Sequence, residues 1–204
     1  LAVSLNDGDG NFTYTASYAV NAGATDLAVG DVNGDALADV VVVGEPGDGG
    51  EHLGQVRVFT NDWTAPGELA GQDTTYFLYG RPRQVRLADV NGDGELDIVT
   101  VNDGGGQYVS EGGGGSTWTP AANGHTVTLM QNDGAGGFFD SSEARDLGDR
   151  MTHDWVPDYA VRQIAVGDLN ADHAAEIIVS SNADLDVLTF DGGALVKHDW
   201  GSSH

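Results

Sequence analysis

Short apolar runs of strand length recur along the chain, and turn residues bound each of them. Examples lie at residues 39–43, 96–101 and 176–179, where valine and isoleucine dominate. Such β-branched runs between glycine, asparagine and aspartate predict β strands. No stretch keeps a 3.6-residue hydrophobic period over the length of a helix. The pattern therefore predicts an all-β fold.

A longer composite pattern recurs three times. An alternating apolar run leads into Asp-x-Asn-x-Asp, three further residues follow, and an acid then opens the next apolar run. We name these segments the acidic loops and the last acid of each the closing acid. The three acidic loops are residues 31–39, 89–97 and 168–176, with closing acids Asp39, Asp97 and Glu176.

A second turn type accompanies the acidic loops. Apolar runs end in Asn-Asp-Gly or similar turns at residues 5–8, 60–62, 131–134 and 190–192. These residue types favour the positive φ angles of tight hairpins. Each repeat is then interpreted as strand, acidic loop, strand, connection, strand, hairpin turn and strand. Repeats with four strands each are typical of β-propeller blades.

On this interpretation the chain holds about three full four-stranded antiparallel blades. They are predicted at residues 26–79, 83–144 and 161–200, and residues 1–20 supply two strands that match the end of a preceding blade. Propellers close with about 4 to 8 blades. We therefore expect residues 1–200 to be part of a larger ring, or of one completed by another copy or chain. Residues 201–204 are predicted to be a linker or tag remnant.

The residue types in the acidic loops suit calcium. This hard cation takes about 6 to 8 oxygen ligands. Positions 1, 3 and 5 of a tight loop can turn three side-chain oxygens to one point, the closing acid at position 9 adds more, and a backbone carbonyl at position 7 fits as well. Carboxylates so close would otherwise repel one another. An EF-hand is excluded, because its last acid is at position 12 and its flanks are helical.

The acidic loops resemble the FG-GAP or VCBS repeats of integrin α-chain propellers and of many bacterial and archaeal surface proteins. The family pattern is Asp-x-Asp/Asn-Gly-Asp-Gly-x-x-Asp between strands. The loop at Asp89 matches it throughout, and the loop at Asp31 has Ala36 at the second glycine. The loop at Asp168 departs further, with Ala171 and His173 at the two glycines and Glu176 at the end.

The resemblance implies about three calcium sites, of which the third departs most from the pattern. It implies side-chain ligands from loop positions 1, 3, 5 and 9 and a backbone carbonyl from position 7. These residues are Asp31, Asn33, Asp35, Leu37 and Asp39; Asp89, Asn91, Asp93, Glu95 and Asp97; and Asp168, Asn170, Asp172, Ala174 and Glu176. Because protein ligands nearly fill such a shell, we expect the metal to stabilise the fold, not to catalyse.

Charge narrows the range of partners. The chain has 32 acidic and 8 basic residues, a net charge of -24, which repels nucleic acid and anionic membranes. There is no cysteine, so no disulfide stabilises the fold and bound metal is the alternative. No apolar run reaches 18 residues, so membrane insertion is not expected. With the resemblance, this favours an extracellular or cell-surface location.

In the propellers that the acidic loops resemble, the connections between strands two and three and between blades lie on the face opposite the metal loops. The resemblance therefore implies that face for the long connections at residues 44–53, 103–124 and 144–159. Loops on a rigid scaffold often carry function, and aromatic side chains there can stack on a sugar or anchor a peptide. The alternative is that these aromatics pack against their own loops. The candidate ligand-binding residues are Tyr108, Trp118, Trp155, Tyr159, Arg81 and Arg83.

No catalytic motif with its expected context occurs in the sequence, so we expect no enzymatic activity. The leading hypothesis is a non-enzymatic, calcium-binding extracellular module for adhesion or recognition of a protein or glycan. One alternative is a lectin or an accessory domain of a polysaccharide-degrading enzyme. Another is a structural subunit that assembles, as a homo-oligomer or with a further chain, into a closed ring or filament.

Overall fold

The regular structure of the chain consists of β strands. A computed structural model describes residues 1–20, 23–45, 54–61, 64–65, 68–78, 80–103, 106–111, 115–120, 125–138, 151–155, 161–181, 185–191 and 193–198. All regular elements within these residues are strands, which confirms the all-β prediction. None of the described segments forms a helix long and apolar enough to cross a membrane.

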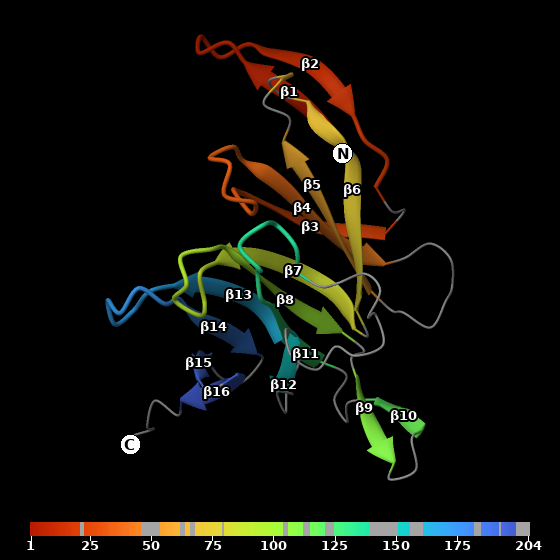
Figure 1. Cartoon of the computed structure of the whole chain (residues 1–204), viewed down its shortest axis with the longest axis vertical. Coiled ribbons are helices and arrows are strands. Elements are labelled where there is room, and N and C mark those ends of the chain that lie inside the picture. The colour runs from red at the N-terminus through yellow and green to blue at the C-terminus, as the bar shows by residue number, and fades with distance from the viewer. Residues whose placement is uncertain are drawn as a thin grey trace.

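The strands form three four-stranded antiparallel sheets, as the repeat pattern predicted, together with two hairpins (Figure 1). In each large sheet the strands follow one another in chain order. The first sheet contains β3 (Gly23–Gly30), β4 (Asp39–Glu45), β5 (Gly54–Asn61) and β6 (Leu69–Leu78). The second contains β7 (Arg81–Ala88), β8 (Asp97–Asp103), β11 (His125–Met130) and β12 (Met151–Trp155). The third contains β13 (Val161–Gly167), β14 (Glu176–Ser181), β15 (Leu185–Asp191) and β16 (Ala194–His198).

Two parts of the predicted connections are strands instead. The hairpin of β9 (Gly106–Glu111) and β10 (Gly115–Pro120) lies between β8 and β11. Strand β12 lies within the connection predicted at 144–159 and pairs with β11, so the second sheet extends past residue 144. The sequence of β12 is Met-Thr-His-Asp-Trp and has no β-branched apolar run, so only its pairing with β11 identifies it as a strand.

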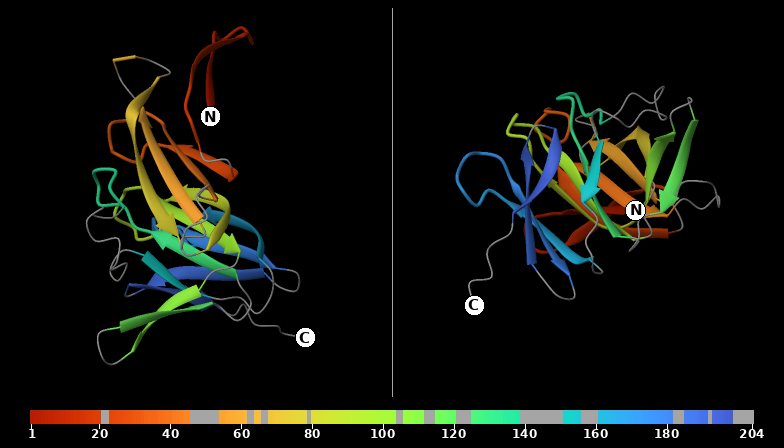
Figure 2. Two further views of the ribbon diagram at one scale, coloured as in Figure 1. Left: turned by 90° about the vertical axis from the view of Figure 1, so that its right-hand side faces the viewer. Right: turned by 90° about the horizontal axis from the view of Figure 1, so that it is seen from below.

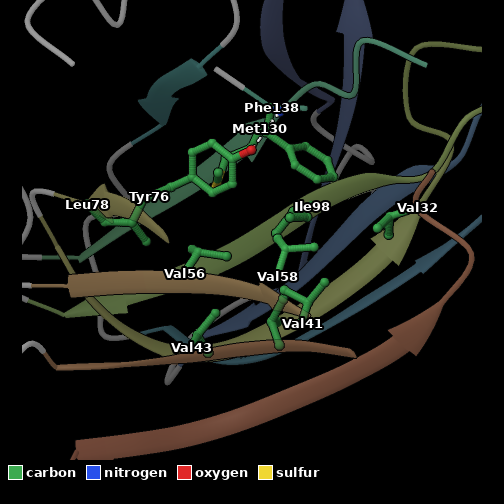
Figure 3. Close-up of a cluster of buried hydrophobic side chains, with 11 residues drawn as sticks. Val32, Val41, Val43, Val56, Val58, Tyr76, Leu78, Ile98, Met130 and Phe138 are labelled. Atoms are coloured by element: carbon green, nitrogen blue, oxygen red, sulfur yellow. Dashed lines mark hydrogen bonds between the residues drawn. The ribbon is translucent and has the colours of Figure 1, made fainter. Parts of the chain in front are cut away.

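The three sheets stack face to face in chain order and bury their apolar side chains between them (Figure 1). Between the first two sheets, Val41 and Val56 pack against Ile98 and Met130 (Figure 3). Strand β8 is buried on both faces, because a sheet covers each of its sides. This accounts for its continuous apolar run, since a strand covered on both faces has no solvent-facing positions to make polar.

A small hairpin covers part of the outer face of the first sheet. It consists of β1 (Ala2–Asn6) and β2 (Phe12–Ser17). Apolar residues flanking and within it pack against Phe59 and Leu69. The Tyr18 hydroxyl accepts a hydrogen bond of 2.7 Å from the Leu69 N–H, and its ring lies 6.1 Å from that of Phe59. The hairpin is thereby attached to β5 and β6, the outer half of the sheet.

The stack is open at both ends within the described residues (Figures 1 and 2). In the first strand of the first sheet, Leu27 and Val29 are 48% and 58% exposed, whereas the equivalent Val85 of the second sheet is 0% exposed. At the far end, Leu169 is 57% exposed, whereas Val32 and Val90 at the same loop position are buried. Positions that other sheets bury are therefore exposed at the two ends.

Candidate functional site: the acidic loops

The three acidic loops lie along one edge of the stack. Each joins the first strand of a four-stranded sheet to the second: β3 to β4, β7 to β8, and β13 to β14 (Figure 1). Neighbouring loops are in contact. The Ala175 N–H donates to the carbonyl oxygen of Asp89 over 2.7 Å, which links the second and third loops. The Asn132 amide donates to the carbonyl oxygen of Val32 over 2.8 Å, which links the first loop to the second sheet.

The first acid of each loop organises the backbone that follows it. In the first loop, Asp31 Oδ1 accepts the Gly34 N–H over 2.8 Å and Oδ2 accepts the Ala36 N–H over 2.7 Å. The carboxylate thus accepts the backbone N–H groups that a neighbouring strand would bind in a sheet, as aspartate commonly does in turns. The second and third loops repeat these bonds from positions 4 and 6 to Asp89 and Asp168, over 2.6 to 3.0 Å.

Positions 3 and 5 form a second contact that recurs in all three loops. The Asn33 side-chain amide donates to Asp35 Oδ2 over 3.0 Å, and the equivalent bonds measure 2.8 Å in the second loop and 2.9 Å in the third. The ion pairs among the described residues join other acids to arginine or lysine, and none includes an acid of these loops. Within the described residues, hydrogen bonds are the interactions that meet their negative charge.

The closing acids of the first two loops are buried and held from two sides. Asp97 is 0% exposed, and its Oδ2 accepts the Val90 N–H over 3.0 Å. Its Oδ1 accepts the backbone N–H of Asn132 over 2.9 Å. Asp39 is buried in the same way, with bonds from Val32 and from the Asn61 N–H. Each closing acid thus joins its loop to the end of the third strand.

Asn61 and Asn132 are the functional residues that sequence reasoning missed. Both were interpreted only as turn formers. In the structure, the Asn132 side-chain amide also donates to the carbonyl oxygen of Leu96 over 2.9 Å, and that of Asn61 donates to Ala38 over 3.0 Å. The available signal was the recurrence of asparagine near the end of the third strand in two repeats.

Burial changes the acidity of these carboxyl groups. Desolvation raises the pKa of Asp97 from 3.8 to about 6, and the negative charges of Asp93 and Asp89 act in the same direction. The N–H bonds from Asn132 and Val90 lower it, but by less. Burial also raises the pKa of Asp39. An ionised carboxylate is therefore costly at both positions unless a positive charge compensates it.

The third loop holds its closing acid differently. Glu176 Oε2 accepts the Leu169 N–H over 2.7 Å, and Oε1 accepts the Asn170 side-chain amide over 3.0 Å. No bond from the end of the third strand reaches Glu176 within the described residues. At Asp168, desolvation raises the pKa, but four backbone N–H bonds, from His173, Ala171, Asn170 and Asp172, outweigh it and leave the pKa below its ordinary value.

All three loops place positions 4 and 6 in the left-handed region. The second loop has Gly92 and Gly94 there, with φ of 77° and 92°. The first loop replaces the second glycine with Ala36, at φ 66°. The third loop replaces both, with Ala171 at 64° and His173 at 77°. Because a Cβ atom makes this conformation costly, the third loop carries the most backbone strain.

The donor chemistry of the loops fits calcium. Each loop supplies carboxylate oxygens and one side-chain amide within nine residues, and hard oxygens are what this cation prefers. As the loops stand, no three acidic or histidine side chains in the described part of the chain gather around one point. Instead, the amide NH₂ of position 3 contacts the carboxylate of position 5. Leu37, Glu95 and Ala174 are fixed by their own N–H bonds to position 5, over 2.8 to 2.9 Å.

The predicted ligand-binding residues belong to several different elements. Tyr108 and Trp118 are directly paired backbone positions of the β9–β10 hairpin, which lies away from the acidic loops (Figure 2). Trp155 ends β12, and Tyr159 lies outside the described residues. The two arginines, at the start of β7, form ion pairs: Arg83 Nε with Asp103 Oδ2 at 2.6 Å, and Arg81 Nε with Glu45 Oε1 at 3.8 Å.

Comparison with known protein families supports the resemblance of the acidic loops to FG-GAP repeats. Residues 31–100 match the model of the FG-GAP-like repeat. The matched span runs from the first acidic loop into β8 and includes both loops whose closing acid is aspartate. No curated protein matches the chain. Residues 31–100 are therefore an FG-GAP-like repeat region, as the resemblance indicated.

Proposed function

We propose that the chain is a non-enzymatic, calcium-stabilised module of β-propeller type that recognises a protein or glycan outside the cell or at its surface. The observation that supports this most directly is the closing acid of the first two loops. Asp39 and Asp97 are fully buried, their pKa values are raised, and no basic residue within the described structure pairs with them. A bound cation would remove that electrostatic cost.

The first two loops are the stronger candidates for calcium. Side chains at loop positions 1, 3, 5 and 9 would hold the ion, which would supply positive charge among carboxylates that otherwise repel. Asn33 and Asn91 would present their amide oxygen in place of the NH₂ that now contacts position 5, a rotation that exchanges the two ends of the amide. The third loop would bind less tightly, because strain at Ala171 and His173 opposes its closed form.

Calcium in this role would stabilise the fold and not react. An ion bound only by the folded state adds about 2.7 kcal/mol when its concentration is a hundred times Kd. Because the loops contact one another in series, each ion would also fix the contact between neighbouring sheets. The long connections at the opposite edge, including the β9–β10 hairpin, would then be presented on a rigid support for a protein or glycan.

Calorimetric titration of the metal-free chain with calcium tests the proposal. We expect saturable binding at two or more sites and a higher Tm in calcium than in chelator. Asp89→Asn with Asp97→Asn removes two carboxylates of the second loop and should abolish one site. A matched control is Asp7→Asn with Asp9→Asn, which changes the charge equally in the exposed β1–β2 turn. An equal Tm in calcium and chelator would show that no metal stabilises this fold.

A further inference from the structure

Strand β1 is the third strand of an incomplete four-stranded unit. The turn Asn6-Asp7-Gly8 begins at the last residue of β1, and the turn Asn132-Asp133-Gly134 lies just beyond the end of β11. The two turns have the same bonds: the Asp7 N–H donates to the Asn11 carbonyl over 3.1 Å, and the Asp133 N–H to the Gly137 carbonyl over 2.9 Å. The third strands β5 and β11 are each paired on both sides. Among the described residues, strand β1 is paired only with β2, so its other edge is open there.

Asn6 stands at the position of Asn61 and Asn132 but lacks their partners. In those residues the backbone N–H donates to a closing acid and the side-chain amide donates to the carbonyl before that acid. Asn6 is exposed, and its side chain accepts only the Gly8 N–H, over 2.9 Å. No described carboxylate or carbonyl accepts from its side-chain amide. The two donor groups are therefore available at the open edge.

An uncovered apolar surface lies on the same face of the first sheet as the hairpin, because Leu27 and Val29 are paired with Val42 and Val40, which pack against it. Leu27 and Val29 on β3 are about half exposed. The equivalent residues of the second sheet, Val85 and Leu87, pack within the core formed with the first sheet, where Val32, Val41 and Val43 lie. Those three residues belong to one strand pair and its acidic loop (Figure 3). By analogy, the cover that is missing over Leu27 and Val29 of β3 would consist of a first strand, an acidic loop and a second strand.

We propose that the open edge of β1, with Asn6 and the surface of Leu27 and Val29, is a docking site for a β-strand pair joined by an acidic loop. The second strand of the pair extends the sheet from β1. Its closing acid accepts the Asn6 N–H, and the carbonyl before that acid accepts the Asn6 side-chain amide. Its apolar residues cover Leu27 and Val29. The added strand thus extends an open sheet edge, and its binding also requires the closing acid that accepts the Asn6 N–H.

The strand pair comes from a polypeptide segment outside residues 1–204. The chain has three such pairs of its own, and the second strand of each is already paired with a third strand: β4 with β5, β8 with β11, and β14 with β15. A second copy of the described structure therefore has no free pair to donate. The docking bonds involve only protein groups, so the inference does not rest on the proposed calcium binding.

A peptide with the sequence of residues 81–103, which holds β7, the acidic loop and β8, is a direct probe. We expect it to bind the full chain saturably in calcium and in chelator, and to slow amide hydrogen exchange at Ala2–Asn6. Asn6→Ala should weaken binding about tenfold, because it removes a side-chain hydrogen bond and disturbs a charged one. The Asp97→Ala change in the peptide should weaken binding at least as much.

Control variants separate docking from nonspecific adhesion of an apolar peptide. Leu169→Ser lies at the far end of the stack and should leave binding unchanged, whereas Leu27→Ser should weaken it. Equal binding by Asn6→Ala and the unaltered chain would overturn the proposal. So would concentration-dependent self-association of the chain with protection of β1, because the occupant would then be a second copy.

A fusion protein tests the proposal even if the isolated peptide does not fold into a strand pair. The same segment is joined through a flexible linker to Leu1, which places it before β1 in the order of the other repeats. We expect a Tm above that of a fusion with the shuffled segment, and Asn6→Ala should reduce the gain. If the peptide does not bind and the fusion raises no Tm, the proposal is wrong.

Discussion

The second and third acidic loops share one hydrogen-bond framework but differ in how the rest of the molecule supports it. Both have the bonds from positions 4 and 6 to the first acid, over 2.6 to 3.0 Å. The second loop is also tied to the third strand of its sheet through Asn132, whereas the closing acid of the third loop is bound from inside the loop by Asn170. Contacts within the loop therefore set its shape, whereas tertiary contacts decide whether the loop is attached to the rest of its sheet.

The apolar residue at position 2 shows the same division. Val90 is 1% exposed, because it enters the core between the second and third sheets. Leu169 is 57% exposed, because no sheet of the described chain follows the third. The same loop position therefore contributes to the core in one repeat and not in the other. Four experiments test this difference between the two loops.

The largest expected effect is at the closing acid. In calcium, Asp97→Ala should lower the free energy of unfolding by about 3 kcal/mol, because it leaves two buried N–H groups without a partner and removes a metal ligand. Glu176→Ala should cost about 1 kcal/mol, because its bonds are confined to the loop. Urea denaturation measures both. Equal losses for the two variants would mean that the hydrogen bond from the Asn132 N–H to Asp97 adds nothing to the stability.

The pH dependence of the chelated protein should differ between the loops. The pKa of Asp97 is about 6 in the folded chain and 3.8 in the reference state, so the folded state binds the proton more tightly. This group therefore contributes stability below about pH 4 that is lost as pH rises through 6, at most roughly 3 kcal/mol. Asp168 has the opposite sign, because its pKa is lowered. Its contribution is lost as pH falls through its folded pKa.

Denaturation between pH 4 and pH 8 in chelator, for the unaltered chain and Asp97→Asn, isolates this group. The difference between the two curves should change most between pH 4 and 6. A constant difference would contradict the raised pKa. Asp168→Asn is the matched variant in the third loop. Because the pKa of Asp168 is lowered from 3.8, its difference from the unaltered chain should be nearly constant between pH 5 and 8 and should shrink only toward and below pH 4.

The position 2 pair tests the sheet interface. Val90→Ala should destabilise the chain by about 2 kcal/mol, because it opens a cavity between two packed sheets. Leu169→Ala should change the stability by less than about 0.5 kcal/mol, as expected for an exposed site. A comparable loss at Leu169 in thermal or urea unfolding would indicate that this end of the stack is covered in solution.

The smallest effect concerns backbone strain. Ala171→Gly and His173→Gly should each raise the stability by about 0.5 to 1 kcal/mol, because glycine adopts a positive φ without cost. The reverse change, Gly94→Ala, meets no atom within 4 Å of the added Cβ and should cost a similar amount through φ alone. Differential scanning calorimetry resolves these shifts. An unchanged Tm for all three variants would mean that the loops relax.

Much of the architecture was predictable because it is encoded in short, local patterns. The β-branched runs predicted strands such as β4 and β8, and the repeat order predicted four-stranded sheets. The Asp-x-Asn-x-Asp spacing identified the acidic loops and the family of residues 31–100. Predictions without a local signal were less successful. Strand β12 has no apolar run, and the β9–β10 hairpin lies between glycine-rich segments.

The shape of the acidic loops follows from local sequence, because their aspartates bond to N–H groups only a few residues away. Which closing acids are buried and bound by an asparagine near the end of the third strand depends on the tertiary structure, since that contact spans 35 residues between Asp97 and Asn132. The tertiary structure also decides which apolar positions are buried by a neighbouring sheet. Val85 and Leu27 are equivalent in sequence, and stacking of a neighbouring sheet alone makes one core and leaves the other at an open end.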